Sequence, residues 1–529
     1  MATKQRTKRN PRNTQSPPGP KLAKSPTGIA GLDEITDGGL PTGRPTLVCG
    51  SAGSGKTMLG MEFLVRGATQ FKENGVMMMF EENDRDISEN TRSLGFDVDR
   101  LVKQKKLAVD YVYLERSEIE ETGEYDLEGL FIRLTHAIDS VGAKRVVIDT
   151  LEALFSAFKD ETVLRAELRR LFRWLKDRGM TAVITGERGE RSLTRYGLEE
   201  YVADCVILLD HRVIDEISTR RLRVVKYRGT THGTNEYPFM IGSRGLSVLP
   251  ITSLTLNHQV SMQRVSSGLP GLDGMLGAKG YYRGSSVLVS GPPGTGKSSF
   301  AALFANAACA RGERVLFFAY EESVSQLVRN MRSIGVDLQQ WLDRGLLHIH
   351  ASRPTLYGLE QHLMQMHDLV LELKPAVVLV DPISNLSFDH DAIGFKPTLM
   401  RLIDFLKQQR ITALFTNLTE DGTVALAAGN TGVSSLMDTW LLVSNLQGNA
   451  ERTRALQVLK SRGMSHSNQV REFVITGRGI ELIDVFRTGS LTLTGSARSQ
   501  EQGRLASAAG AGAPPRAARR PAAARRGKA

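Results

Sequence analysis

Residues 50–57 read Gly50-Ser51-Ala52-Gly53-Ser54-Gly55-Lys56-Thr57, directly after an apolar run at 46–49 and before a helix-like run at 58–67. This order of strand, glycine-rich turn and helix is the P-loop pattern. Its backbone N–H groups and the positive end of the helix dipole cradle the phosphates of a nucleotide. We expect Lys56 to reach the β- and γ-phosphate oxygens and Thr57 to ligate Mg²⁺. The other residues expected at the nucleotide are Gly50, Ser51, Gly53, Ser54, Gly55 and Met58.

The pattern occurs again as Gly291-Pro292-Pro293-Gly294-Thr295-Gly296-Lys297-Ser298, after the apolar run 287–290. One match to so short a pattern is within reach of chance, but two matches in matching contexts are not. Lys297 and Ser298 then take the parts of Lys56 and Thr57, which are phosphate contact and Mg²⁺ ligation. The other residues expected at this second nucleotide are Gly291, Gly294, Thr295, Gly296 and Ser299.

Two further motifs occur in both halves of the chain, each at the end of an apolar, strand-like run. One is a pair of glutamates, Glu81-Glu82 and later Glu321-Glu322. The other is a single acid, Asp149 in the first half and Asp381 in the second. An acid in this place after a P-loop is the Walker B carboxylate, which holds Mg²⁺. Without a P-loop before it, such an acid is more often an ordinary strand end.

The corresponding motifs of the two halves lie a nearly constant 232 to 241 residues apart, so the halves align almost without insertion. This indicates an internal duplication. Within each half, apolar strands alternate with amphipathic helices, which predicts an α/β fold with a doubly wound, mostly parallel sheet. The boundary between the halves is expected between Pro250 and Arg264.

Near the close of each half, the segment Lys226-Tyr227-Arg228-Gly229-Thr230-Thr231-His232 is matched by Lys460-Ser461-Arg462-Gly463-Met464-Ser465-His466. The alternation predicts that both cations of a segment lie on one face of a strand. Taken alone, either pair of cations is equally well explained as solvated charge on an edge strand. Recurrence at the same place in both halves favours a shared role, namely contact with phosphate.

At 529 residues, the chain exceeds the size of a single hydrophobic core. Its net charge of +11 comes from the two ends, because residues 1–24 carry +7 and residues 501–529 carry +6, which leaves −2 for the remainder. Disordered tails are expected at 1–24 and 499–529 from their composition. We interpret them as solubilising segments, with weak nonspecific contact to nucleic acid or acidic surfaces as the alternative.

The three cysteines are an odd number without metal-ligand spacing, which favours buried thiols in a reducing cytoplasm. The first residues lack the apolar segment of a signal peptide, and no apolar run approaches the length needed to cross a bilayer. We therefore expect a soluble cytoplasmic protein without a membrane partner.

In combination, these motifs resemble the KaiC family of circadian clock ATPases, which belongs to the RecA superfamily. The resemblance rests on the tandem P-loops, the glutamate pairs and the two Lys-x-Arg-Gly-x-x-His segments. Residues 195–200 (Arg-Tyr-Gly-Leu-Glu-Glu) and 493–498 (Leu-Thr-Gly-Ser-Ala-Arg) add to it. It covers about residues 25–498, and it implies a first RecA-like ATPase domain at 25–255 and a second at 256–498.

The resemblance implies a homohexamer of two stacked rings, with ATP at the subunit interfaces. The first ring would hydrolyse ATP slowly, and its glutamate pair would orient or deprotonate the attacking water. The second ring would phosphorylate and dephosphorylate its own Ser434 and Ser435, which match the phosphoacceptor pair of the family. There the glutamate pair would activate the acceptor hydroxyl, with Glu321 also near Mg²⁺. Outside this context, two adjacent serines are commonplace.

The resemblance also brings side chains of the adjacent subunit to each nucleotide. The matching residues are Lys226, Tyr227, Arg228, Gly229, Thr230 and His232 in the first half, and Lys460, Ser461, Arg462 and His466 in the second. Arg454 and Ser93 are further nucleotide contacts. Two features depart from the family: Ile334 replaces a frequent adenine-stacking Trp, and the chain after Arg498 diverges from the segment that binds the partner KaiA. A KaiA-like partner is therefore not expected, while a KaiB-like partner stays open.

The main interpretation is an ATP-hydrolysing hexamer with serine autokinase and autophosphatase activity, which uses ATP and Mg²⁺ and acts in timing or stress signalling. An alternative of another class is a RecA-like, DNA-dependent ATPase, a relative of recombinases or helicases. Such an enzyme needs basic loops that face a channel, whereas the positive charge of this chain lies in its tails. A third interpretation is a scaffold that binds nucleotide without catalysis, and the intact glutamate pairs argue against it.

Overall fold

The computed structural model describes residues 22–81, 84–112, 127–155, 161–189, 193–194, 202–214, 217–250, 260–386, 392–419, 433–448, 451–484, 486–488 and 491–493. The described residues form two compact units, essentially those up to residue 255 and those from residue 256 onward. The predicted boundary between Pro250 and Arg264 falls largely on residues outside the described ranges, and it stays a prediction.

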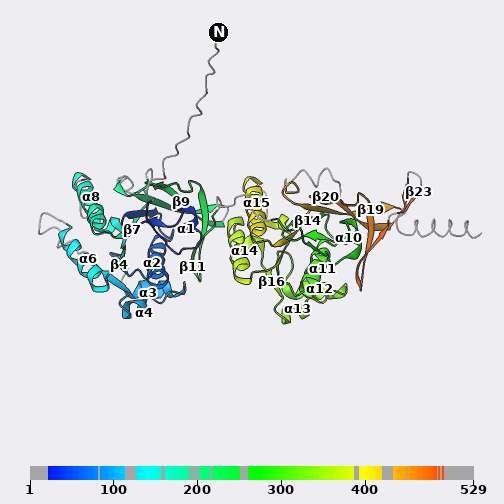
Figure 1. Cartoon of the computed structure of the whole chain (residues 1–529), viewed down its shortest axis with the longest axis horizontal. Coiled ribbons are helices and arrows are strands. Elements are labelled where there is room, and N and C mark those ends of the chain that lie inside the picture. The colour runs from blue at the N-terminus through cyan, green and yellow to red at the C-terminus, as the bar shows by residue number, and fades with distance from the viewer. Residues whose placement is uncertain are drawn as a thin grey trace, which may run out of the picture. The chain divides into compact units, whose positions relative to one another are not determined.

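The described part of the first domain is built on a sheet of nine strands in the order β11-β10-β9-β8-β3-β7-β6-β4-β5 (Figure 1). The six strands from β8 to β5 run parallel, and β9, β10 and β11 continue the sheet antiparallel. The strands are β3 (Pro45–Gly50), β4 (Gly75–Met79), β5 (Leu107–Tyr111), β6 (Arg145–Asp149), β7 (Thr181–Glu187), β8 (Cys205–Ile214), β9 (Ile217–Tyr227), β10 (Glu236–Gly242) and β11 (Gly245–Val248).

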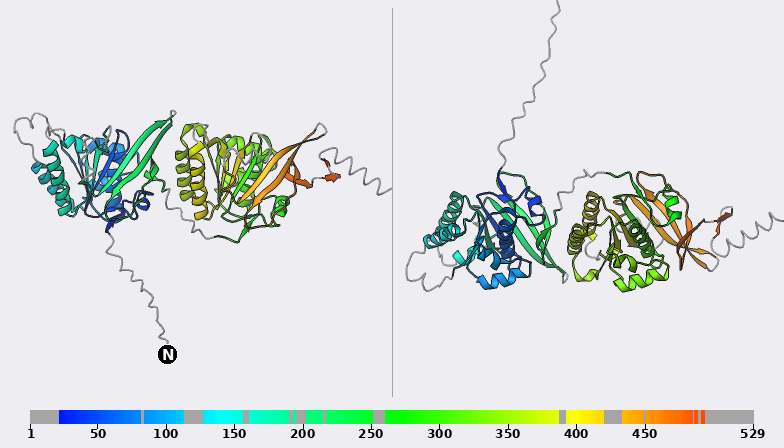
Figure 2. Two further views of the ribbon diagram at one scale, coloured as in Figure 1. Left: turned by 90° about the horizontal axis from the view of Figure 1, so that it is seen from above. Right: turned by 60° about the horizontal axis from the view of Figure 1, so that its bottom comes forward.

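Helices cover both faces of this sheet (Figure 2). The central strand β3 shows why, because Val48 packs in one apolar layer while Leu47 and Cys49 pack in the other. A strand buried on both faces needs a continuous apolar sequence, which is the run recognised at 46–49. The helical elements are α1 (Leu32–Ile35), α2 (Lys56–Arg66), the π-helix η1 (Gly67–Phe71), α3 (Asp84–Arg92), α4 (Val98–Lys103), α6 (Glu128–Val141), α7 (Leu151–Phe155) and α8 (Glu161–Asp177).

The second domain repeats this topology over its described residues, in the order β16-β15-β17-β18-β14-β19-β20-β21-β22. Six strands are again parallel, and β20, β21 and β22 are the antiparallel extension. The strands are β14 (Ser286–Gly291), β15 (Val315–Ala319), β16 (Leu347–Ala351), β17 (Val377–Asp381), β18 (Thr412–Leu418), β19 (Thr439–Gly448), β20 (Glu451–Ser461), β21 (Arg471–Thr476) and β22 (Gly479–Asp484). The predicted fold class, two tandem RecA-like domains with mostly parallel sheets, is confirmed.

The helical elements of the second domain follow the same plan. The helical elements are α10 (Pro270–Met275), α11 (Lys297–Ala310), α12 (Val324–Ser333), α13 (Gln339–Asp343), the 3-10 turns η2 (Pro354–Leu356) and η3 (Ile383–Leu386), α14 (Leu359–Leu373) and α15 (Ala392–Gln408). The P-loop helix α11 packs in one apolar layer together with α10, α12 and α13. Small two-stranded sheets pair β12 (Arg264–Val265) with β13 (Tyr281–Tyr282) and β23 (Phe486–Thr488) with β24 (Leu491–Leu493).

The folded part of the first domain extends into the predicted tail at 1–24. Lys24 begins β1 (Lys24–Ser25), which pairs with β2 (Leu40–Pro41). The Lys24 ammonium donates to the carbonyls of Thr36 and Asp37 at 2.7 and 2.9 Å. Its charge therefore serves a local contact that composition could not reveal. Residues 1–21 and 494–529 lie outside the described residues.

All three cysteines are free and buried, as the sequence predicted. Burial raises the pKa of the Cys205 and Cys309 thiols to about 12, so both stay protonated at neutral pH. Among the described residues, we find no helix that is long and apolar enough to cross a membrane.

Candidate functional site

Each P-loop lies at the carboxyl end of the central strand of its sheet, where the turn leads into α2 or α11. Lys56 donates to the carbonyls of Gly50 and Ser51, both at 3.0 Å. In the second loop, Lys297 donates to the carbonyls of Gly291 and Pro292 at 2.9 and 2.8 Å. Both lysines are buried, at 8% and 7% exposure. A buried ammonium that curls over its own loop is correctly placed to pair with phosphate oxygens inside that loop.

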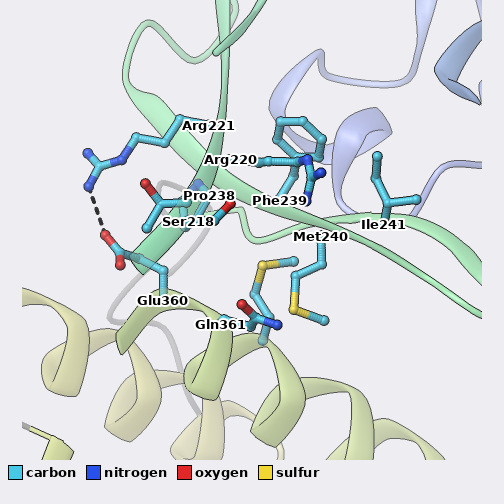
Figure 3. Close-up of a pocket in the computed structure, with 11 residues that line it drawn as sticks. Ser218, Arg220, Arg221, Pro238, Phe239, Met240, Ile241, Glu360 and Gln361 are labelled. Carbon is cyan, nitrogen blue, oxygen red and sulfur yellow. Dashed lines mark hydrogen bonds and ion pairs between the residues drawn. The ribbon is translucent and has the colours of Figure 1, made fainter. Parts of the chain in front are cut away.

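The last glycine of each loop permits a turn that no other residue would. Gly55 and Gly296 have φ of 98° and 95°, in the left-handed region, and each caps the following helix. A Cβ at Gly55 would lie 2.6 Å from Cδ1 of Ile241, and one at Gly296 would lie 2.7 Å from Cδ1 of Ile475. Figure 3 shows Phe239 and Ile241 on one side of β10 and Met240 on the other. The loop is thus seated on an apolar surface that the antiparallel strands supply.

The remaining loop residues leave space on the outer side. A Cβ at Gly53 or Gly294 would meet no atom within 4 Å. The first N–H groups of a helix have no acceptor within that helix, so those that open α2 and α11 are available to a ligand at the loop. Ser54 Oγ is buried and has no hydrogen-bond partner among the described residues. Thr57, Met58 and Ser298 are half-buried in the first helical turns, and Ser299 is buried. This arrangement fits the phosphates of a nucleotide.

The Walker B acids lie at the carboxyl ends of β6 and β17, one strand removed from the P-loop strand across β7 or β18. Asp149 accepts a short hydrogen bond from the Thr185 hydroxyl, and Asp381 accepts one from Thr416. The Ser298 hydroxyl lies near Asp381 and favours the charged form of that carboxylate. Two of the residues predicted to ligate Mg²⁺ are therefore neighbours in the second domain.

These donors fit Mg²⁺ of the kind that is held mainly by nucleotide phosphates. We find no group of three or more His, Cys, Asp or Glu side chains that could hold a metal in the part of the chain that the structure describes. Mg²⁺ in nucleotide sites takes one or two protein ligands, and the phosphates and waters supply the rest. A hydroxyl beside one carboxylate, as in Ser298 and Asp381, matches that need.

The predicted catalytic glutamates lie just beyond the strands next to the Walker B strands. Glu81 is exposed, and one of its oxygens accepts from the Thr150 hydroxyl at 3.2 Å. Glu321 is also exposed, and Asn385 donates to it at 3.1 Å. Glu322 is half-buried and accepts from Asn330 at 2.9 Å. Glu82 lies outside the described residues.

Charges in the second site are coupled. Burial is the main cause that lowers the pKa of Lys297, to about 8, although the nearby carboxylates of Asp381 and Glu321 act in the opposite direction. Burial likewise raises the pKa of Asp381, and hydrogen bonds from Thr416 and Ser298 offset part of that rise. A bound nucleotide with Mg²⁺ would restore the charged form of both groups, because it brings opposite charge to each.

Ser434 and Ser435 lie at the opposite end of the parallel strands from their own P-loop. They form a turn directly before β19, and Val287 near the start of β14 pairs with Thr439. The P-loop follows the other end of β14, at Gly291, which is four residues from Val287 and so roughly 13 Å away along the strand at about 3.3 Å per residue. The phosphoacceptor pair is therefore separated from the nucleotide loop of its own domain.

The second pair of cations gathers around this same turn. Lys460 pairs with Trp440 at the start of β19, and its ammonium donates to the carbonyls of Ser434 and Ser435 at 3.1 and 3.4 Å. Arg462 donates to the Ser435 carbonyl at 2.9 Å. Lys460 and Arg462 thus share one side, as predicted, although the arginine lies one residue past the end of β20.

Arg454 lies at the other end of β20, close to its own P-loop. It pairs with Asn445, and its Nε donates to the carbonyl of Gly294 at 3.3 Å. The residues predicted to contact the second nucleotide therefore form two groups. Arg454 can serve the nucleotide of its own domain, whereas Lys460 and Arg462 face away from it.

Other predicted contacts have structural roles of their own. Tyr227 is 5% exposed, and its hydroxyl donates to the carbonyl of Gly39 at 2.8 Å, so its ring belongs to the core. The Ser461 hydroxyl is buried against that of Thr439 at 3.1 Å. Ser93 is exposed just after α3 and donates to the carbonyl of Asn90 at 2.8 Å. The side chains of these three residues are thus engaged within the domain.

The first pair of cations occupies the equivalent place in the first domain. Lys226 lies in β9 opposite Val206, near the start of β8, and Arg228 follows the end of β9. Gly229 has a φ of 84°, which the left-handed turn after the cations requires. Thr230, His232 and His466 are half-buried. Residues 195–200 lie outside the described ranges.

The sequence did not single out several residues that hold the site together. Thr185 and Thr416 bond the Walker B acids, and Thr150, Asn385 and Asn330 bond the glutamates. The two threonines could have been found, because they stand at corresponding places in β7 and β18. Asn330 could have been found as well, because Asn90 stands at the corresponding place after the first glutamate pair, whereas Asn385 corresponds to Ala153 and offered no such signal.

Comparison with known proteins agrees with this geometry. The sequence model of the KaiC ATPase family matches residues 25–253 and again residues 265–485. A circadian clock protein KaiC2 from Synechocystis sp. is 56% identical over 479 residues, which cover 90% of this chain and 84% of that protein. Circadian clock oscillator proteins KaiC from Prochlorococcus marinus and Synechococcus elongatus are each 38% identical. Those two matches cover 88% and 90% of this chain, and 93% and 92% of the relatives.

Proposed function

This chain belongs to the KaiC family of ATPases, and from that premise we propose that it is a homohexameric ATPase that also phosphorylates and dephosphorylates its own Ser434 and Ser435. In this proposal the first domain hydrolyses ATP, and the second transfers the γ-phosphoryl group to the serines. The names of its relatives support a role in circadian or other timing. A KaiB-like partner is consistent with this role, and a KaiA-like partner is not proposed.

One observation carries the proposal. The acceptor turn and its two cations lie at the amino ends of the parallel strands of the second sheet, whereas the Lys297 loop lies at their carboxyl ends. In-line transfer requires the attacking oxygen to come within about 3–3.5 Å of the phosphorus. The serines cannot approach their own nucleotide without unfolding the sheet. Transfer becomes possible in an assembly where the acceptor turn of one subunit meets the P-loop of the next subunit. Such an assembly keeps the sheet intact and still brings the serine oxygen to the phosphorus.

The reaction then takes place between two subunits. The Oγ of Ser434 or Ser435 forms a bond to the γ-phosphorus, the bond to the β-phosphate oxygen breaks, and ADP leaves. The proton of the serine passes to a carboxylate of the neighbour's glutamate pair, of which Glu321 is held by Asn385. Lys460 and Arg462 would neutralise charge on the transferred group. Mg²⁺ beside Ser298 and Asp381 would neutralise charge on the phosphates.

In the first domain, the corresponding P-loop and Walker B acid would serve ATP hydrolysis. Glu81 is held by Thr150, which follows the Walker B acid Asp149 directly. A carboxylate fixed in this place can orient a water for attack on the γ-phosphate. Lys226 and Arg228 would reach the nucleotide of the adjoining subunit, as we propose for their counterparts in the second domain.

The proposal is tested with mixed hexamers of two variants. Lys297→Ala has lost the phosphate clamp of the second domain but keeps its serines. The other variant, Ser434→Ala with Ser435→Ala, keeps the clamp and has no acceptor. Neither should label alone, and after mixing, phosphate should appear in residues 411–452 of the Lys297→Ala subunit. If wild type labels readily and the mixture does not, transfer occurs within one subunit and the proposed geometry is wrong.

A further inference from the structure

Asp438 is a centre of contacts between the acceptor turn and the body of the second domain. It follows the turn directly and precedes β19. Its carboxylate accepts from the backbone N–H and the hydroxyl of Ser286, both at 2.9 Å. It also pairs with the Lys407 ammonium at 2.8 Å. One side chain thus ties the end of the turn to the first residue of β14 and to α15.

The same residue fixes the cations on the other side of the turn. The Asp438 carbonyl accepts from the backbone N–H of Arg462 at 2.8 Å, and its carboxylate lies 4.0 Å from the Arg462 guanidinium. Arg462 and Lys460 in turn hold the carbonyls of the serine turn. The turn is therefore bound both through Asp438 and through a cation that Asp438 positions.

The surroundings keep this carboxylate charged. Burial, the largest single effect, raises the pKa of Asp438, but the hydrogen bonds from Lys407 and Ser286 together outweigh it and hold the pKa below its usual value. Val433 and Met437, which flank the two serines, are buried at 1% and 0% exposure. The turn thus has an apolar anchor on each side and one ionic clamp.

We propose that Asp438, clamped by Lys407 and Ser286, is a positioning residue for serine phosphorylation. It sets where the Ser434 and Ser435 hydroxyls stand and keeps Arg462 beside them. The inference rests on the proposed function, because it concerns the acceptor side of that reaction. Asp438 makes no contact with a reacting atom in this arrangement. It acts through the turn and through Arg462.

The first domain contains the corresponding clamp without the acceptors. Asp204 lies 3.4 Å from Arg44 and 3.6 Å from Lys176, and its carbonyl accepts from the backbone N–H of Arg228 at 2.9 Å. In the sequence, the positions that match the two serines hold glutamate and tyrosine. Lys176 is therefore a matched control for Lys407, since it clamps an equivalent aspartate that no serine pair precedes.

The test compares Lys407→Gln and Asp438→Asn with Lys407→Arg and Lys176→Gln, in the full chain. Three quantities are measured: the initial rate of serine phosphorylation against ATP concentration, the ratio of label on Ser434 to label on Ser435, and hydrogen exchange at residues 433–437. A small displacement of a reacting group is sufficient to slow transfer by about tenfold or more.

Lys407→Gln and Asp438→Asn should each slow phosphorylation about tenfold, leave the half-saturating ATP concentration unchanged, change the label ratio and speed exchange in the turn. Lys407→Arg should restore most of the rate, and Lys176→Gln should change none of the three quantities. Wild-type rate, ratio and exchange in both Lys407→Gln and Asp438→Asn would overturn the inference. A rate loss with an unchanged ratio and unchanged exchange would overturn it too. If wild type takes up no phosphate, the proposed function fails, and the exchange result still decides whether the clamp holds the turn.

Discussion

The two domains share the geometry of the P-loop and the Walker B acid but differ in the groups that hold the glutamates. In both, the P-loop lysine bonds two carbonyls of its own loop, a glycine turns over an isoleucine, and a threonine bonds the Walker B acid. The glutamates differ, because Glu81 is held by Thr150 and Glu321 by Asn385. The P-loop must match a phosphate, which has one shape. In the proposed function the glutamates act on different nucleophiles, so they are under no such common constraint.

The two domains also differ in how deeply the arginine of a corresponding arginine–glutamate ion pair is buried. In the first domain, the fully buried guanidinium of Arg145 pairs with Glu73 and donates to the carbonyl of Phe63 at 2.9 Å. In the second domain, Glu313 pairs with Arg283, whose side chain is 24% exposed. The same topology thus tolerates a fully buried arginine in one copy and a partly exposed one in the other.

The largest expected effect separates the glutamate pairs. Glu81→Gln with Glu82→Gln should lower hydrolysis by roughly 10²–10⁴-fold and spare serine phosphorylation, because an amide keeps the shape but cannot take the proton. Glu321→Gln with Glu322→Gln should lower phosphorylation by a similar factor. Phosphate release and serine label are measured on the same samples. Equal loss of both activities in both variants would contradict the division of labour between the domains.

The next effect is on stability and concerns the two arginine–glutamate ion pairs. Arg145→Met should cost about 3 kcal/mol of unfolding free energy, because it leaves Glu73 and the buried carbonyls without their donor. Arg283→Met should cost less than about 1 kcal/mol, as is usual for partly solvated pairs. Denaturant unfolding, with hydrogen exchange assigned to each domain, measures both. Similar losses in the two variants would show that burial does not distinguish the two arginines.

A smaller effect depends on pH. Because burial lowers the pKa of Lys297 to about 8, the free loop loses its charge as pH rises above that value, and binding ATP then requires uptake of a proton. In a Lys56→Ala chain, where the second loop binds alone, ATP affinity should be constant below about pH 8. Above it, affinity should fall by about tenfold per unit. Lys297→Arg is the control, since arginine stays charged. An affinity that stays constant to pH 9 would refute the shifted lysine.

The smallest expected effect compares the two folded domains with the basic tails. Single-stranded DNA should change ATP turnover by no more than about twofold, because the net positive charge lies in the terminal residues 1–24 and 501–529, while the remainder carries −2. The measurement uses the full chain and a chain without residues 1–21 and 499–529, at two salt concentrations. Strong, salt-sensitive stimulation of both chains would favour the DNA-dependent ATPase instead.

Much of the site followed from short patterns in the chain. Lys56, Lys297 and the glycines of both loops lie where the P-loop pattern places them, because that pattern is local and its backbone geometry leaves little choice. The acids at the ends of β6 and β17 were equally accessible, since apolar strands buried on both faces are easy to recognise. The buried role of Tyr227 was not, because a tyrosine beside two cations has the same appearance whether its ring faces the core or a ligand.

Local spacing and duplication were sufficient to establish two P-loop domains with parallel sheets, since strand, turn and helix are each encoded within a few neighbouring residues. Only the folded chain decided where the serines stand and what holds them. Ser434 meets Lys460 because the antiparallel register of β19 and β20 returns the chain to the same edge. Asp438 meets Ser286 because parallel β14 and β19 begin side by side. Such contacts depend on hydrogen-bond register between distant segments, and residue spacing along the chain does not express that register.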